Sequence, residues 1–170
     1  MDHEIVSIDE VGFQLATNYK RIWFERGKKP KRAFLWSNKK LTVFAAQLEN
    51  EKVFYEFHIA QNSIIFMSFL NGLFNYLDKN KKYVFIIDNA GWHKTQLVKN
   101  YFEKQKNWIK VEFIPPYSPE LNPIETNWKV TRHNVTKSNY FKTIDDLQIA
   151  LELFWDEHLF KQKFMRYLCR

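Results

Sequence analysis

Two aspartates, each at the end of an apolar run, are the first residues in this sequence that could do chemistry. The run EIVSID (residues 4–9) ends in Asp9, and the run YVFIID (residues 83–88) ends in Asp88. Short apolar runs are typical of buried strands, and neighbouring parallel strands bring their carboxyl ends to one edge of a sheet. Two carboxylates at one edge repel each other unless a cation lies between them, and hard oxygen ligands favour Mg²⁺ or Mn²⁺. The pair therefore predicts a divalent metal site.

A third carboxylate ends the stretch PPYSPELNPIE (residues 115–125), which holds four of the five prolines of the chain. Prolines restrict the backbone, so this stretch predicts a stiff, irregular loop that leads into a helix. Asn122 suits the N-cap, Pro123 the first helical position and Glu125 the third, which is the spacing of a capping box. Glu125 is therefore either a cap that reaches back to the Asn122 amide or a third metal ligand that the stiff loop holds in place.

The two aspartates also have explanations that need no metal. Asp88 begins the sequence DNAG, which could be a turn in which the Asp and Asn side chains bond to their own backbone. Asp9 and its neighbour Glu10 could be solvated residues at a strand end. Glu10 is in any case a poor partner for Asp9 in one metal site, because adjacent strand residues point to opposite faces of a sheet.

Basic residues dominate the charge of the chain, with 26 Lys and Arg against 19 Asp and Glu and a net charge of +7. This balance favours a polyanionic partner or, equally, a lysine-rich solvated surface. The segment RGKKPKR (residues 26–32) gathers five of these cations and predicts a flexible basic loop. In the helix after the proline-rich stretch, Glu125 is followed by Lys129 and Arg132, which could form ion pairs along the helix or contact phosphates.

Composition narrows the class of protein. Hydrophobic residues make up 45% of the 170 residues, which indicates a single folded domain over residues 1–170 with one sizeable core. No stretch of about 18 uncharged apolar residues occurs, so we expect no membrane span. The N-terminus MDHEIVSIDE lacks the regions of a signal peptide, and the single cysteine, Cys169, excludes an internal disulfide and a multi-cysteine zinc site. We therefore expect a cytoplasmic protein.

The elements that must position the three carboxylates follow from the apolar pattern. Residues 12–36 are predicted to be a hairpin that carries the basic loop. Antiparallel strands come first and strand–helix alternation follows, so we expect a mixed α/β sheet with parallel later strands and helices on both faces. Strands are predicted over residues 4–9, 41–49, 52–58, 83–88 and 109–114, and helices over residues 62–77 and 95–106 and from about Asn122 and Thr143.

Helical spacing predicts the apolar face of each helix, and the start of the last helix, TIDD, resembles a capping box. The predicted core residues are Ile65, Phe69, Leu73 and Tyr76 in the first helix, Leu97, Val98, Tyr101 and Phe102 in the second, Ile124, Trp128, Thr131 and Val135 in the third, and Ile144, Leu147, Leu151, Phe154 and His158 in the last.

Three motifs together resemble the catalytic triad of mariner-like DDE transposases, in their prokaryotic insertion-sequence branch. They are VSIDE with Asp9, FIIDNAGWHK with Asp88 and PPYSPELNPIETNW with Glu125, and the resemblance spans about residues 4–160. It implies a ribonuclease-H-like fold in which the three carboxylates are catalytic and bind Mg²⁺ or Mn²⁺, two ions in all. It further implies cleavage of double-stranded DNA at the ends of an insertion sequence and transfer of the freed strand to target DNA.

The resemblance also implies residues and partners beyond the triad. His93 and Lys94 match the segment after the second aspartate and are expected to touch DNA or to support that aspartate, whereas Ser118, Asn122 and Trp128 match the third motif as scaffold. The basic segment is expected to contact DNA or a second subunit, and a homodimer is expected in the DNA complex. The expected DNA-binding residues are Arg26, Lys28, Lys29, Lys31, Arg32, His93, Lys94, Lys129 and Arg132.

One departure from the family leaves alternatives open. Family members carry helix-turn-helix DNA-recognition domains before the catalytic core, whereas Asp9 stands near the start of this sequence. We expect such domains to be absent, so the chain is a catalytic fragment, the second half of a split reading frame with a separate recognition chain, or a degenerate remnant. The competing functions are a truncated, non-catalytic DNA-binding or regulatory protein and a ribonuclease-H-like nuclease that acts on hybrids or branched DNA.

Overall fold

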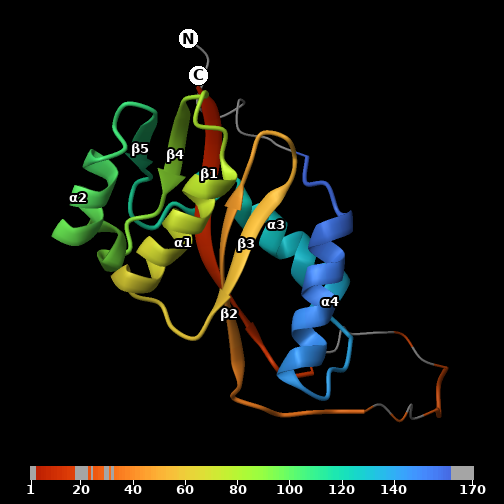
Figure 1. Ribbon diagram of the computed structural model, residues 1–170. Coiled ribbons are helices and arrows are strands. Elements are labelled where there is room, and N and C mark those ends of the chain that lie inside the picture. The colour runs from red at the N-terminus through yellow and green to blue at the C-terminus, as the bar shows by residue number, and fades with distance from the viewer. Residues whose placement is uncertain (1–2, 18–22, 24, 29–30, 32, 162–170) are drawn as a thin grey trace.

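A five-stranded mixed sheet forms the middle of the molecule (Figure 1). The computed structural model describes residues 3–17, 23, 25–28, 31 and 33–161. Along the sheet the strand order is β3-β2-β1-β4-β5, with β1, β2 and β3 antiparallel and with β4 and β5 parallel to β1. This is the mixed α/β arrangement that the sequence predicts. The strands are β1 (Glu4–Gln14), β2 (Lys40–Gln47), β3 (Val53–His58), β4 (Tyr83–Ile87) and β5 (Ile109–Phe113).

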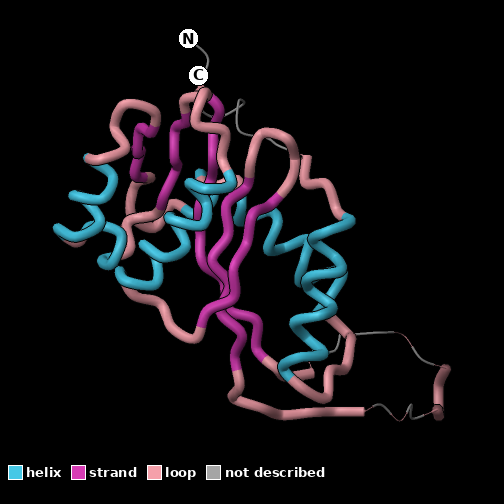
Figure 2. Tube along the Cα trace, in the orientation of Figure 1, coloured by secondary structure: helices cyan, strands magenta, loops and turns pink. Residues whose placement is uncertain are grey.

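Helices cover both faces of the sheet, as Figures 1 and 2 show. One face packs against α1 (Ser63–Tyr76) and α2 (Gln96–Glu103), and the other against α3 (Ile124–Thr131) and α4 (Ile144–Glu157). Each face has its own apolar core, because strands that are covered on both sides bury alternate residues in opposite directions. The short turns are η1 (Gly91–Lys94), η2 (Pro119–Leu121) and the π-helical η3 (Arg132–Thr136). None of the helices within the described residues is long and apolar enough to cross a bilayer.

Two helix starts follow directly from their capping residues. The Asn62 side chain accepts hydrogen bonds from the amides of Ile64 and Ile65, at 3.0 Å each, and so fixes the beginning of α1. At the start of α4 the Thr143 hydroxyl accepts from the Asp146 amide, and the Asp146 carboxylate accepts from the Thr143 amide. The capping box predicted for TIDD is confirmed.

The buried faces of α1 and α2 differ in part from the prediction. In α1, Phe69 and Leu73 are buried as expected, but Tyr76 is 52% exposed, and its ring lies tilted against that of Phe54 with centroids 5.1 Å apart. In α2, Val98 is buried whereas Leu97 is 49% exposed. The other predicted residues of the two helices are buried or pack against the core, so only Tyr76 and Leu97 depart from the prediction. Several apolar residues in a row allow more than one face, and packing against the sheet selects one. The buried face of α1 consists of Phe66, Phe69, Leu70, Leu73 and Phe74.

The first strand is longer than predicted. β1 continues past Asp9 to Gln14, so the aspartate lies within the strand and not at its end. The inserted segment before β2 therefore spans residues 15–39, in place of the predicted 12–36. Its described part forms no strand, although the Thr17 amide still donates to the Leu35 carbonyl (2.9 Å). Residues 33–39, which lead into β2, are the pink loop along the lower edge of Figure 2.

Candidate active site

Asp9, in β1, lies beside Asp88, which directly follows the neighbouring parallel strand β4. The register of β1 and β4 pairs Ser7 with Ile86, and two residues further along it places Asp9 beside Asp88. β4 ends at Ile87, so Asp88 is the first residue beyond that strand, while β1 continues in pairing with β2 alone. The sheet therefore opens at this point, and both carboxylates lie at the opening.

Glu125 reaches the same place because the start of α3 is fastened to β1. Asn122 is only 3% exposed, and its Nδ2 donates to the carbonyl of the β1 residue that precedes Asp9 (3.2 Å). Its Oδ1 accepts a hydrogen bond from the Ser7 hydroxyl, which in turn accepts one from the Ile124 amide (3.4 Å). These bonds hold the chain on either side of Pro123 against β1, and Glu125 follows in the first turn of the helix. Asn122 is therefore scaffold, as the third motif implies.

Glu125 does not form the capping box that its spacing allows. The Asn122 amide, which a capping box would join to the Glu125 carboxylate, donates to the Pro119 carbonyl at 3.0 Å. The N-cap residue of α3, Pro123, has no side-chain cap to offer, and the helix begins at Ile124. Within the described part of the chain, no ion pair joins Glu125 to Lys129 or Arg132 either. The carboxylate of Glu125 is thus left without the two structural roles that the sequence offered as alternatives.

Asp9 is a buried carboxylate, with 8% of its surface exposed. Burial raises the pKa of Asp9 to about 7, a hydrogen bond from Trp128 Nε1 to Oδ2 (2.8 Å) opposes the rise, and the charges of Glu10 and Glu125 add to it. A carboxylate in this position is unfavourable as an anion until a cation balances it. The electrostatics of Asp9 therefore favour a cation at the opening of the sheet.

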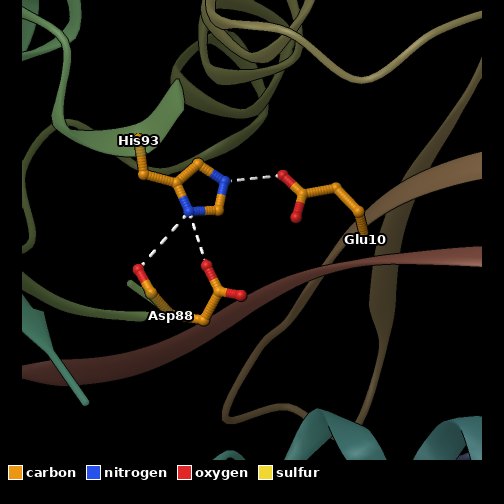
Figure 3. A group of neighbouring side chains, drawn as sticks. All are labelled: Glu10, Asp88 and His93. Atoms are coloured by element: carbon orange, nitrogen blue, oxygen red, sulfur yellow. Dashed lines mark hydrogen bonds and ion pairs between the residues drawn. The ribbon is translucent and has the colours of Figure 1, made fainter. Parts of the chain in front are cut away.

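His93 lies between the carboxylates of Asp88 and Glu10 and contacts both (Figure 3). Its Nδ1 lies 2.7 Å from Asp88 Oδ1 and its Nε2 lies 2.7 Å from Glu10 Oε1. The imidazole has no exposed surface, and the Glu10 side chain is 4% exposed. Burial alone would lower the pKa of His93, but the two carboxylates outweigh burial and raise it to about 9. The ring is therefore an imidazolium at neutral pH.

The same contacts fix the orientation of Asp88. Partial burial raises the pKa of Asp88, but hydrogen bonds from His93 and from the Ala90 amide (2.9 Å) more than offset this and lower it. Both hydrogen bonds are made by Oδ1, so Oδ2 is the oxygen that remains for a ligand. Glu10 points to the opposite face from Asp9, as strand alternation predicts.

Glu10, Asp88 and His93 also form a cluster whose ligand atoms lie within 4.8 Å of one another. A metal needs a histidine nitrogen with a free lone pair, whereas both nitrogens of His93 carry protons that point at carboxylates. The positive charge between Glu10 and Asp88 is already supplied by the imidazolium. We therefore interpret this cluster as a buried ion-pair network that supports Asp88.

All three predicted carboxylates line one cleft of about 520 Å³, together with Lys94 and the proline-rich loop from Pro115 to Pro119. The side-chain Nδ2 of Asn89 donates to the Ile114 carbonyl. This bond joins the loop after β4 to the loop after β5, and the two loops are walls of this cleft. A second hollow of about 560 Å³ lies over α2 and β5 and contains none of the three carboxylates. The cleft with the carboxylates is the candidate active site.

The expected DNA-binding residues fall into three groups. Lys94 is exposed and lines the cleft, and Lys129 and Arg132 are exposed along α3 and η3. Arg26, Lys28 and Lys31 are exposed in the inserted segment, where Lys28 forms an ion pair with Glu25, whereas Lys29 and Arg32 lie outside the described residues. His93 is fully buried, which corrects the expectation that it touches DNA and leaves its support of Asp88.

Of the contacts that orient the two aspartates, only the support of Asp88 by His93 was expected from the sequence. Trp128 was assigned to the core, without its hydrogen bond to Asp9, and Glu10 was assigned no role. The available signal was the chemistry of neighbouring residues: a second acid directly after Asp9 and a histidine five residues after Asp88. Neither signal specifies a contact by itself, because 83 residues separate Glu10 from His93.

Comparison with known proteins places the fold and the family. The structure is similar to the Mos1 strand transfer complex, with a TM-score of 0.75 and 19% identity, covering 92% of this chain and 48% of that one. It is also similar to the catalytic domain of Mos1 mariner transposase, with a TM-score of 0.69 and 18% identity, covering 92% of this chain and 71% of that one. The ribonuclease-H-like fold is therefore confirmed.

The sequence comparisons agree with this fold. The uncharacterized protein y4pE/y4sA of Sinorhizobium fredii (strain NBRC 101917 / NGR234) is 39% identical over 81 residues, which cover 48% of this chain and 56% of that protein. The chain thus matches about half the length of this relative and of the Mos1 chain in the strand transfer complex. The family model described as DDE superfamily endonuclease matches residues 4–148. The chain belongs to the DDE superfamily endonuclease family.

Proposed function

We propose that this chain is the catalytic part of an insertion-sequence transposase, which cleaves DNA strands and joins a freed strand to target DNA with Mg²⁺ or Mn²⁺. The observation that carries the proposal is the meeting of Asp9, Asp88 and Glu125 in one cleft from three separate segments of the chain. Membership in the DDE superfamily endonuclease family supports the reaction class. Structures of the Mos1 paired-end complex with Mn and with Mg support the choice of metal.

The donor set of the cleft fits a hard divalent cation. Three carboxylates converge there, and Asp9 is buried among negative charges. Among the residues that the structure describes, none makes a hydrogen bond or ion pair that competes for Oδ2 of Asp88 or for the carboxylate of Glu125. We assign these three residues as the ligands of two ions. Bound divalent metals supply charge neutralisation at the scissile phosphate and activation of the attacking water or 3′-hydroxyl.

The surrounding residues keep the ligands in place. Trp128 holds Asp9 through its indole, His93 holds Asp88 through Oδ1, and the bonds of Asn122 to β1 set the position of Glu125. Each ligand is thus oriented by a buried partner, as precise metal sites require. Lys94, at the wall of the cleft, supplies a cation for a phosphate next to the reacting one.

The partners follow from the same proposal. Double-stranded DNA at element ends and at the target is the substrate, and the chain pairs as a homodimer in the DNA complex. The phosphate contacts come from the exposed cations of the inserted segment, of α3 and of η3, since backbone contacts are sequence-independent. Sequence recognition is assigned to helix-turn-helix domains, on a separate chain if this one works as a single domain over residues 1–170. The site of action is the cytoplasmic nucleoid.

The direct test is the matched pair Glu125→Gln and Glu120→Gln. Both glutamates belong to the segment from η2 to α3, but only Glu125 lines the cleft with the two aspartates. Glu125→Gln should abolish Mn²⁺-dependent cleavage, by about a thousandfold or more, because a neutral amide is a poor metal ligand. Glu120→Gln should cleave like the parent. Equal cleavage by the parent and Glu125→Gln would refute the assignment.

The choice of substrate separates this proposal from the two competing functions. Cleavage should be compared on duplexes that carry the terminal repeats of the DNA flanking the gene, on an RNA–DNA hybrid and on a four-way junction. Preference for the repeat duplex, followed by joining to a second DNA, supports the transposase. Cleavage of the hybrid or junction alone indicates a ribonuclease-H-like nuclease. DNA binding without cleavage in the presence of bound Mn²⁺ indicates a regulatory protein.

A further inference from the structure

Tyr117 stands at the tip of the proline-rich loop with its side chain in solvent. Its exposed fraction is 101%, and it lines the same cleft as the three carboxylates. No hydrogen bond or ring contact links the phenol to any other described residue. An aromatic side chain held this way contributes nothing to the apolar core, so the stability of the fold does not explain it.

The backbone at Tyr117 is also unfavourable. Its φ is +58°, in the left-handed region that bulky residues rarely adopt. The other positive-φ residues among those described are the polar Glu51 and Ser138, together with Gly27. A strained residue that makes no hydrogen bond or ring contact with the described part of its chain points to a role in binding.

The loop holds this exposed ring in a defined place. Pro115 and Pro116 restrict the chain before it, and the Ile114 amide donates to the Ile87 carbonyl (3.0 Å) where β4 ends. After it, the 3-10 turn η2 closes with a hydrogen bond from the Leu121 amide to the Ser118 carbonyl (3.0 Å). A ring presented on a restrained backbone loses little conformational entropy when it binds a flat partner.

We propose that Tyr117 is a stacking platform for an unpaired nucleobase that flanks the scissile phosphate; this inference rests on the proposed function of the cleft. The occupant follows from the surroundings. The carboxylates define where the reacting phosphate lies, Lys94 provides a cation in the same cleft, and the next base of a bound strand is the flat apolar group that must lie nearby. Stacking on an aromatic ring accepts any base, because every base has a π-face.

The test is a double-mutant cycle between the ring and the base. Kd and kcat/KM are measured for a duplex with two unpaired nucleotides next to the cut and for the same duplex with an abasic nucleotide at the flanking position. Tyr117→Ala should weaken binding of the base-containing substrate about tenfold and binding of the abasic substrate less than twofold. Tyr117→Phe should stay within twofold of the parent on both, because the ring is retained.

Folding and the proposed function are controlled separately. Tyr117→Gly, whose backbone accepts positive φ, should unfold no earlier than the parent and should lose binding as Tyr117→Ala does. With 2-aminopurine as the flanking base, the parent and Tyr117→Phe should quench its fluorescence on binding, and the alanine variant should not. This quenching requires no cleavage, so quenching by a parent that does not cut would overturn only the proposed function. Equal losses on base-containing and abasic substrates, or equal quenching by parent and Tyr117→Ala, would overturn the stacking role.

Discussion

The indole Nε1 of Trp128 lies 2.8 Å from Oδ2 of Asp9, and the helix that carries this indole also carries Glu125. One helix therefore supplies a proposed metal ligand from its first turn and the group that orients a second ligand from the next turn. Any displacement of α3 relative to β1 moves both at once. The site is consequently built on the packing of α3 against the sheet.

Replacing Trp128 by Phe should impair the reaction while the core remains filled. The substitution removes the only hydrogen-bond donor that the indole gives to Asp9, and that bond lowers the pKa of this carboxyl. The pKa of Asp9 should rise further, so the acidic limb of the pH–rate profile should move to higher pH and metal should bind about tenfold more weakly. Full pH–rate profiles at several Mn²⁺ concentrations measure both effects. An unchanged acidic limb would contradict a role for this bond.

Asp9 should destabilise the metal-free protein at neutral and alkaline pH. Its folded pKa of about 7 lies above the ordinary aspartate value of 3.8, so the folded state binds the proton more tightly. Stability from this group is present below about pH 4 and is lost as the pH rises through 7. Asp9→Asn should therefore raise the free energy of unfolding at pH 8 by about 2–4 kcal/mol in the absence of metal.

The metal response provides the control for this prediction. Mn²⁺ should raise the Tm of the parent and leave that of Asp9→Asn nearly unchanged, because binding to the folded state alone is what stabilises it. Urea unfolding at pH 5 and pH 8 gives the free energies of unfolding of both proteins. Thermal unfolding with chelator and with Mn²⁺ gives their Tm values. A variant that is less stable than the parent at pH 8 without metal would show that Asp9 is not the source of repulsion.

His93 should also stabilise the fold in a pH-dependent way, but here the cause is attraction to two carboxylates, whereas for Asp9 it is burial. Its pKa is raised from 6.5 to about 9, so its contribution is complete below about pH 6.5 and is lost as the pH rises through 9. His93→Gln, which leaves Glu10 buried without a cation, should lower the free energy of unfolding by about 3 kcal/mol at pH 6. The difference between parent and variant should shrink above pH 9.

Two further variants separate the partners of His93. Glu10→Gln in the His93→Gln background should restore part of the stability, because the unpaired buried charge is removed. The double variant should still cleave DNA poorly, since Asp88 lacks its orienting partner. If His93→Gln and the parent differed by the same amount at pH 6 and pH 10, the imidazolium would not be the source of the stabilisation.

The strands, the helices and the three carboxylates could be predicted from local patterns in the sequence. Each carboxylate follows a recognisable local pattern: an apolar run before Asp9 and before Asp88, and a proline-rich stretch before Glu125. In the structure the two runs lie in strands, and the proline-rich stretch is a loop that lines the cleft. The end of β1 could not be predicted, because the residues after Asp9 have no continuous apolar run and their pairing with β2 is set by tertiary contact. The buried face of α1 was ambiguous for a similar reason, since its apolar residues outnumber one stripe.

The contacts of Trp128 with Asp9 and of His93 with Glu10 were beyond prediction because they join distant segments. Trp128 and Asp9 are 119 residues apart, and His93 and Glu10 are 83 apart. Strand alternation correctly directed Glu10 away from Asp9, but only the packing of η1 over that face brings His93 to it. Capping chemistry predicted that the Asn122 side chain caps the helix start, whereas in the structure this side chain hydrogen-bonds to β1.

Asn122 should therefore matter more for activity than a helix cap would. Asn122→Ala removes the bonds from its side chain to Ser7 and to β1 and leaves the Ser7 hydroxyl without that partner. We expect a loss of about 2 kcal/mol in the free energy of unfolding and a fall in kcat of about a hundredfold, because Glu125 is no longer held at the cleft. Asn134→Ala is the matched control, since its side chain bonds only to a carbonyl within the same helical segment (2.8 Å). A loss of activity no larger than that of the control, at temperatures where both variants are folded, would show that the bond to β1 does not position Glu125.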